Sequence, residues 1–183
     1  MPEIFQNIHW IDVLFVILLM GICYKGSRVG VGGQIIALTC WIVLVFVSIG
    51  YYKALSEAVF GFLLQKWARP LSFICISSAL YILIKALEMT FNISPAEELS
   101  PIERVLGAGI AALRGFMFCG IVTILVILSP LYGIREMVTR ESKTAMFFME
   151  TNVEIYSKMA KLFGLTKDDR KEEVMNDILT SAL

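Results

Sequence analysis

Three charged side chains lie inside stretches that are otherwise apolar enough for a membrane: Asp12, Glu88 and Arg114. Arg114 follows a helix start at Pro101 and therefore lies about 20 Å along the helix axis. An unpaired arginine at this depth costs at least about 2.5 kcal/mol, so it must reach the interface, line water or meet a carboxylate. Glu88 is the best placed carboxylate. The pair is either a structural ion pair or part of a path for a substrate or an ion.

Asp12 also has two interpretations. It lies at the start of the first apolar run, residues 11–24, next to Trp10, which suits the membrane interface. Asp12 is either a solvated carboxylate in the first helical turn, where the helix dipole favours negative charge, or an intramembrane carboxylate that faces the interior of a helix bundle. The sequence leaves both interpretations open.

The other reactive residue types form no catalytic, cofactor or metal pattern. The 4 cysteines each lie inside an apolar run without a C-x-x-C pair, so we interpret them as small hydrophobic residues. His9 has no other histidine and no cysteine near it, which argues against a metal site. The glycines from Gly26 to Gly33 lack the preceding strand that a dinucleotide site needs. We therefore expect no enzymatic activity, no cofactor and no metal.

The composition is that of a membrane protein. Of the 183 residues, 57% are hydrophobic, and the mean hydropathy is +0.74, which is high for a soluble protein. The net charge is zero, so nothing indicates binding to nucleic acid. The N-terminus lacks the positively charged region and the small-residue cleavage site of a signal peptide, so we expect the first apolar run to stay in the protein.

We predict an all-α membrane protein with four transmembrane helices, an interfacial helix and a C-terminal amphipathic helical tail. The first three spans are residues 11–24, 29–52 and 71–89. The fourth span is residues 116–131 together with the helical turns that precede residue 116. Residues 53–69 are amphipathic and are expected to lie in the membrane plane. The membrane domain then covers residues 1–134. The highly charged tail, residues 135–183, either packs on itself as a soluble unit or lies on the membrane surface.

The last span has a clear start signal and a face of small residues. Ser100 is placed as the N-cap, Pro101 takes the first helical position, and Glu103 completes a capping box. Small residues then recur at helical spacing at Gly107, Ala111, Gly115 and Cys119. A second series leads into the second span, at Gly26, Gly30, Gly33, Ala37 and Cys40. Helices in lipid associate by close packing of small residues, so these faces predict a compact bundle, within one chain or between copies.

Two groups of these residues resemble the colicin V production protein family. The first group fits the family's D-R-x-x-G-A and R-G signature, and consists of Arg104, Leu106-Gly107-Ala108 and Arg114-Gly115. Glu103 stands where an aspartate is expected, which keeps both the charge and the capping role. The second group fits the family's pattern near the start of the chain, which is an aspartate, an apolar run and then G-x-x-x-G with basic residues near its glycines. Its members are Asp12, Tyr24, Lys25, Gly26, Arg28 and Gly30. The resemblance covers roughly residues 10–132.

This resemblance implies a multi-pass protein of the bacterial inner membrane that is needed for production or export of a colicin-type peptide, with a broader part in envelope function. Two other classes stay open. One is a small oligomeric transporter or channel that uses Asp12, Glu88 and Arg114 as its polar path. The other is a scaffold whose tail recruits a cytoplasmic partner. A polar cavity that reaches Arg114 would favour the transporter, whereas a dry, sealed bundle with an ordered tail would favour the scaffold.

The expected partners are the lipid bilayer and, in an assembly, further copies of the chain or other inner-membrane proteins. The distribution of basic residues predicts that both termini lie in the cytoplasm. Lys53 and Arg69 would then lie on the same side as the basic residues that follow the last span, opposite Lys25 and Arg28.

Overall fold

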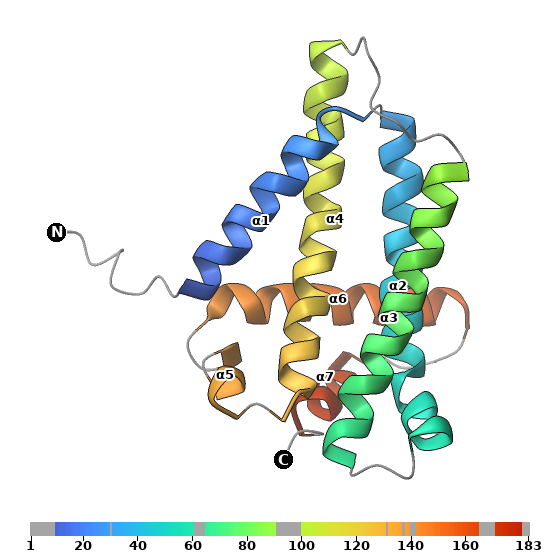
Figure 1. Ribbon diagram of the computed structural model, residues 1–183, viewed down its shortest axis with the longest axis vertical. Coiled ribbons are helices and arrows are strands. Elements are labelled where there is room, and N and C mark those ends of the chain that lie inside the picture. The colour runs from blue at the N-terminus through green and yellow to red at the C-terminus, as the bar shows by residue number, and fades with distance from the viewer. Residues whose placement is uncertain are drawn as a thin grey trace, which may run out of the picture.

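The computed structural model describes residues 10–29, 31–60, 65–90, 100–130, 132–136, 138–139, 142–164 and 171–180. Over these ranges the chain is helical and has no strand, as predicted. The helices are α1 (Trp10–Gly26), α2 (Val31–Val59), α3 (Gln65–Thr90), α4 (Pro101–Leu128), α5 (Tyr132–Glu136), α6 (Lys143–Leu162) and α7 (Lys171–Thr180) (Figure 1).

Among the described residues, 3 helices are long and apolar enough to cross a membrane: α2, α4 and the Trp67–Thr90 part of α3. α1 has 17 residues, fewer than the roughly 20 that a perpendicular span needs. Its outer face is nevertheless apolar, with Val16, Ile17 and Met20 strongly exposed. The described part of the chain therefore has three helices of membrane-spanning character, and the fourth span stays a prediction.

α4 is the central helix of the molecule. It packs against α1 on one side and against α2 on the other, and α2 packs along α3 (Figure 1). α3 contacts α4 far less than it contacts α2, and α1 has few contacts with either α2 or α3. The long helices thus form two pairs, α1 with α4 and α2 with α3, which meet mainly where α2 touches α4. Leu44 and Val45 of α2 and Ile124 and Ile127 of α4 are almost completely buried and belong to the core.

α6 lies across α4 and α2 (Figure 1). Its buried residues recur at helical spacing and comprise Ala145, Phe148, Met149, Asn152, Val153, Ser157 and Ala160. The Phe148 ring packs against Phe15 of α1 and Phe116 of α4, with ring centroids 5.3 and 5.1 Å away. The amphipathic pattern predicted for this part of the chain therefore serves to cover the long helices. A tail packed only on itself does not describe this arrangement, and contact with the membrane surface stays a prediction.

Gly120 permits the close crossing of α6 over α4. A Cβ atom at this position would lie 2.2 Å from Asn152 Nδ2 and 2.5 Å from the Phe148 carbonyl oxygen. Asn152 is completely buried, and its Nδ2 donates a hydrogen bond to the Met117 carbonyl oxygen at 2.8 Å. The amide of Asn152 occupies the space that a side chain at Gly120 would need, and it fixes α6 on one turn of α4.

The separate interfacial helix predicted over residues 53–69 is wrong. α2 continues to Val59, and α3 begins at Gln65 and passes through Pro70. The polar residues near the end of α2 have partners in α7. The Tyr52 hydroxyl donates to Asp177 Oδ2 at 2.6 Å, and Lys53 Nζ lies 2.7 Å from Asp177 Oδ1. α7 thus supplies the polar surroundings that the sequence pattern alone assigned to the membrane interface.

The predicted start of α4 is confirmed. Ser100 Oγ accepts a hydrogen bond from the Glu103 amide at 3.2 Å, and the Ser100 amide donates to Glu103 Oε2 at 2.9 Å. Pro101 is the first helical residue, where the lack of an N–H costs no hydrogen bond.

Candidate functional site

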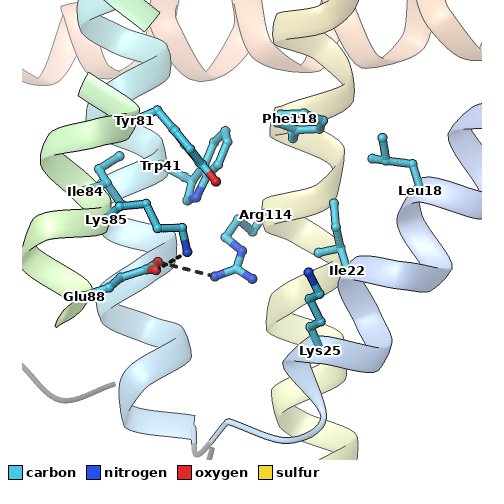
Figure 2. A pocket seen from close by; sticks show the side chains of 10 residues that line it. All are labelled: Leu18, Ile22, Lys25, Trp41, Tyr81, Ile84, Lys85, Glu88, Arg114 and Phe118. Carbon is cyan, nitrogen blue, oxygen red and sulfur yellow. Dashed lines mark hydrogen bonds and ion pairs between the residues drawn. The ribbon is translucent and has the colours of Figure 1, made fainter. Parts of the chain in front are cut away.

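Charged side chains from α1, α3 and α4 point into one space in the half of the bundle where α1 ends (Figure 2). Arg114 Nη1 lies 3.9 Å from Glu88 Oε1, and Lys85 Nζ lies 2.6 Å from Glu88 Oε2. The predicted pairing of Arg114 with Glu88 is confirmed, and Glu88 also binds Lys85 one helical turn away. The side chains of Arg114 and Glu88 are only 20% and 16% exposed. One carboxylate therefore balances two cations in a largely enclosed place.

Close packing of α1 on α4 brings Lys25 to the same space. A Cβ atom at Gly26 would lie 2.1 Å from Ala111 Cβ, and one at Gly107 would lie 2.8 Å from the Gly26 carbonyl oxygen. The two glycines thus let the backbones of α1 and α4 touch, which no larger residue would allow. Because Lys25 precedes Gly26, this contact holds its ammonium group beside the length of α4 that carries Arg114.

The remaining small residues of α4 continue the same packing surface. A Cβ atom at Gly115 would lie 2.7 Å from Leu19 Cδ2 of α1. Ala111 and Cys119 are completely buried. The small face predicted on α4 therefore packs within one chain and aligns α1 along α4.

The second small series has a different place. Ala37 is buried, whereas Cys40 is partly buried and packs against the core. Gly33 lines a cavity together with Ala37. Gly30 lies outside the described residues. This face of α2 therefore leaves open space beside the charged side chains instead of meeting another helix closely.

The first of two cavities at this place has a volume of about 240 Å³. It lies between the helix pair α1–α4 and the helix pair α2–α3. Lys25, Lys85, Glu88 and Arg114 form its polar end, and aromatic side chains form the end nearer to α6 (Figure 2). The cavity thus has one charged end and one apolar end.

The second cavity has a volume of about 370 Å³ and shares Lys25, Lys85, Glu88 and Arg114 with the first. It extends along α2 and includes Arg28 in its wall. Four cationic side chains and one carboxylate therefore line the two cavities. Positive charge in a space with low-dielectric walls attracts anions more strongly than the same charge in water.

Gln34 adds an unsatisfied polar atom to the second cavity. Its side chain is 2% exposed, and Nε2 donates to the Gly26 carbonyl oxygen at 3.3 Å. Oε1 has no hydrogen-bond partner among the residues that the structure describes. A buried acceptor without a partner costs about 1–3 kcal/mol. A hydroxyl group or a water molecule in the cavity would satisfy it, which indicates that the cavity is polar enough to be occupied.

Arg28 is held at the rim by Tyr24. Its guanidinium group donates to the Tyr24 hydroxyl and lies over the Tyr24 ring, 4.7 Å from the ring centroid. Stacking of this kind orients an arginine while its remaining N–H groups stay available. Arg28 is thus placed to meet an anion that enters the second cavity.

Asp12 does not join this cluster. It lies in the first turn of α1, and the Ser142 hydroxyl donates to Asp12 Oδ1 at 2.7 Å. Ser142 is also the N-cap of α6, where its Oγ accepts from the Ala145 amide at 3.1 Å. Of the three intramembrane charges singled out in the sequence, Glu88 and Arg114 meet, whereas Asp12 joins the start of α1 to the start of α6.

Two further residues of the family pattern, Glu103 and Arg104, lie at the start of α4, away from the charged cluster. Glu103 caps α4, and Arg104 lies exposed in the first turn of the same helix. Neither lines the two cavities.

Sequence reasoning missed Gln34 and Lys85 as site residues. The signals available were a glutamine within a series of small residues and a lysine one turn before Glu88.

The fold and the cluster together define an all-helical protein of membrane-spanning character with a cationic cavity between its long helices. Comparison with protein families matches residues 11–153 to the family described as colicin V production protein. The chain belongs to this family, as the resemblance implied. The matched region includes α1 to α4 and the part of α6 that crosses α4. No curated protein and no solved structure matches the chain.

Proposed function

We propose that the protein works in the bacterial inner membrane, where it supports the production or export of a colicin-type peptide and envelope function. Membership of the colicin V production protein family and the three apolar helices support this proposal. At the molecular level, the protein binds an anionic group in its cationic cavity and acts as a small transporter or binding protein without enzymatic chemistry.

The cationic cavity is the observation that carries the molecular part of the proposal. Lys25, Lys85 and Arg114 line it from three different helices, and Glu88 is the one carboxylate among the described residues that line it. Glu88 cannot neutralise all three, so the cavity keeps an excess of positive charge. An anion would gain charge-assisted hydrogen bonds there in surroundings that weaken competition from water. A purely anchoring bundle has no need for such a cavity.

A scaffold is the second candidate, and the packing of α6 favours it. α6 is fixed on α4 and α2, while charged side chains such as Glu154 and Lys158 lie on its exposed side. This surface is available to a cytoplasmic partner if both termini lie in the cytoplasm. Assembly with further copies or with other inner-membrane proteins would use the exposed apolar sides of α1 and α3.

Complementation of a deletion strain separates the two candidates. The variant Lys25→Gln with Lys85→Gln removes two cations from the cavity, and Lys158→Gln with Lys161→Gln removes two from the exposed side of α6. At matched protein levels, we expect the first pair to lose most colicin-type peptide export and resistance to envelope stress, and the second to behave as wild type. The reverse ranking would support the scaffold and contradict the anion-binding function.

A further inference from the structure

An apolar groove continues from the cationic cavity toward the far end of α4. The groove has a volume of about 200 Å³, and its walls are almost wholly apolar. Trp41, Tyr81 and Phe118 line both the groove and the first cavity, so the two spaces adjoin at these aromatic side chains. Beyond these aromatic side chains the groove passes Ile121 and reaches Leu125. The cavity and the groove therefore lie next to each other, with a cationic end and an apolar end.

The groove exists because α3 packs along α2 and leaves α4 at a distance. Two serines, Ser77 and Ser78, line the groove, but their hydroxyl groups donate hydrogen bonds to other groups of the protein. The wall therefore stays almost wholly apolar. Ser77 Oγ donates to Ser48 Oγ at 3.1 Å, and the Ser78 hydroxyl donates to the Ile74 carbonyl oxygen of its own helix. The groove thus offers an occupant apolar contact, without polar groups that would need partners.

The length of the site fits a lipid chain. From Arg114 to Leu125, α4 rises by about 16 Å. The hydrocarbon core of a bilayer is about 30 Å thick, so the chains of one leaflet span about 15 Å. A molecule whose anionic group lies at Arg114 can therefore place most of one chain along the groove.

We propose that this site binds a phospholipid whose headgroup carries a net negative charge, with the phosphate group at Lys25, Lys85 and Arg114 and one chain in the groove. The proposal rests on the anion binding proposed above and names the class of the anion. A phosphate offers several acceptor oxygens to the three cations, and the planar guanidinium group of Arg114 suits paired hydrogen bonds to two of them. The groove distinguishes a lipid phosphate from free phosphate, because free phosphate would leave the groove unfilled.

Native mass spectrometry of the full-length protein in detergent tests the assignment. The probes are phosphatidic acid, phosphatidylcholine with the same chains, and inorganic phosphate. We expect the wild-type protein to retain phosphatidic acid at least tenfold more strongly than phosphatidylcholine, and excess inorganic phosphate to leave the lipid bound. Equal retention of the two lipids would overturn the proposal.

Two variants test the two ends of the site. Lys85→Gln, at a side chain that is 53% exposed, should weaken retention of phosphatidic acid without loss of fold. Ser78→Phe should fill the groove and weaken retention as well, whereas Ala79→Phe, an exposed neighbour that does not line the groove, should not. Thermal melting confirms that each variant is folded. Displacement of the lipid by inorganic phosphate, with no effect of Ser78→Phe, would assign the cavity to a free anion and overturn the lipid site.

The outcome separates this proposal from the proposed function. In one case the cavity variants fail in complementation, but the wild-type protein shows no preference for phosphatidic acid. This result would support the anion-binding function and contradict the lipid site. In the other case the wild-type protein clearly prefers phosphatidic acid, but its cavity variants complement fully. This result would support the lipid site and contradict its role in peptide export.

Discussion

Glu88 determines the charge balance of the cavity. Its carboxylate binds Lys85 at 2.6 Å and Arg114 at 3.9 Å, while Lys25 has no ion pair with another described residue. Glu88 thus keeps Arg114 from being an isolated charge in the cavity.

Exchange of the two charges tests this pairing. Either single variant, Glu88→Arg or Arg114→Glu, places like charges together in a largely buried place and should lower the yield of folded protein. The double variant restores opposite charges and should recover part of that yield. Size-exclusion chromatography of detergent extracts at equal expression measures the folded fraction. A double variant no better than the worse single variant would contradict the pairing.

Asp177 fixes α7 to the end of α2. Burial raises its pKa, but the hydrogen bonds from Lys53 and Tyr52 and the positive charges of Lys53 and Arg69 together lower it by more, so the pKa of this carboxyl lies below its usual value. A carboxyl with a depressed pKa stabilises the folded state above its unfolded pKa, near 3.9, and loses that contribution as the pH falls through the lower folded value. The attachment of α7 should therefore hold at neutral pH and weaken below about pH 4.

Hydrogen exchange of α7, corrected for intrinsic rates, measures this attachment. In the wild-type protein, exchange should be slow at neutral pH and should rise below about pH 4. Asp177→Asn should exchange faster already at neutral pH, with little further change on acidification. Glu172→Gln, at an exposed position on the same helix, is the matched control and should follow the wild type. A pH dependence that survives in Asp177→Asn would show that another group controls α7.

Among the helices, the contact between α1 and α4 decides where the cavity lies. Gly26 and Gly107 let the two backbones touch, and Lys25 is held beside Arg114 as a result. Helix association in lipid depends on such contacts because lipid and side chains are similarly apolar. The chain therefore uses its small residues to position charges as well as to pack.

Two glycines of α4 test this role with matched substitutions. Gly107→Leu must separate α1 from α4, and it should lower stability by at least about 1–3 kcal/mol and reduce complementation. Gly109 has no atom within 4 Å of a Cβ, so Gly109→Leu should be neutral or slightly stabilising, since leucine favours helix. Thermal melting in detergent compares the two proteins. Equal melting temperatures would show that the close contact is unimportant.

Sequence patterns predicted the elements where local rules decide the structure. The capping box at Ser100 and the small face of α4 follow from residue spacing, and the Glu88–Arg114 pair follows from the cost of an isolated charge in lipid. The interfacial helix over residues 53–69 was predicted wrongly because an amphipathic pattern shows that a polar partner exists, without showing which one. Here the partner is Asp177, 125 positions from Tyr52 in the chain.

The cavities could not be predicted from the sequence, because they depend on which helices leave space between them instead of packing against each other. A lysine one turn from Glu88 or a glutamine beside small residues does not reveal that α1 and α3 stay apart. The crossing of α6 over α4 was missed for a similar reason. Gly120 and Asn152 fit each other only after the two helices meet, and neither residue signals the other in the sequence.

For the whole molecule, the prediction is an even number of spans with both termini in the cytoplasm. Single cysteines at Glu97 and Glu150, in a variant without the 4 native cysteines, report the side of each position. With an impermeant thiol reagent on intact cells, the cysteine at Glu97 should label from outside and that at Glu150 only after permeabilisation. Labelling of both from the same side would contradict the topology.

The whole molecule is described by two helix pairs that enclose a site with a cationic end and an apolar end. A phosphatidic acid with a photoactivatable group in its chain tests this description most directly, with the full-length protein in nanodiscs and the cross-linked peptides identified by mass spectrometry. We predict labelling concentrated on residues 73–81 of α3 and 118–125 of α4, which unlabelled phosphatidic acid suppresses and phosphatidylcholine does not. Labelling that follows the exposed side chains of α1, such as Ile17 and Met20, and resists competition would contradict it.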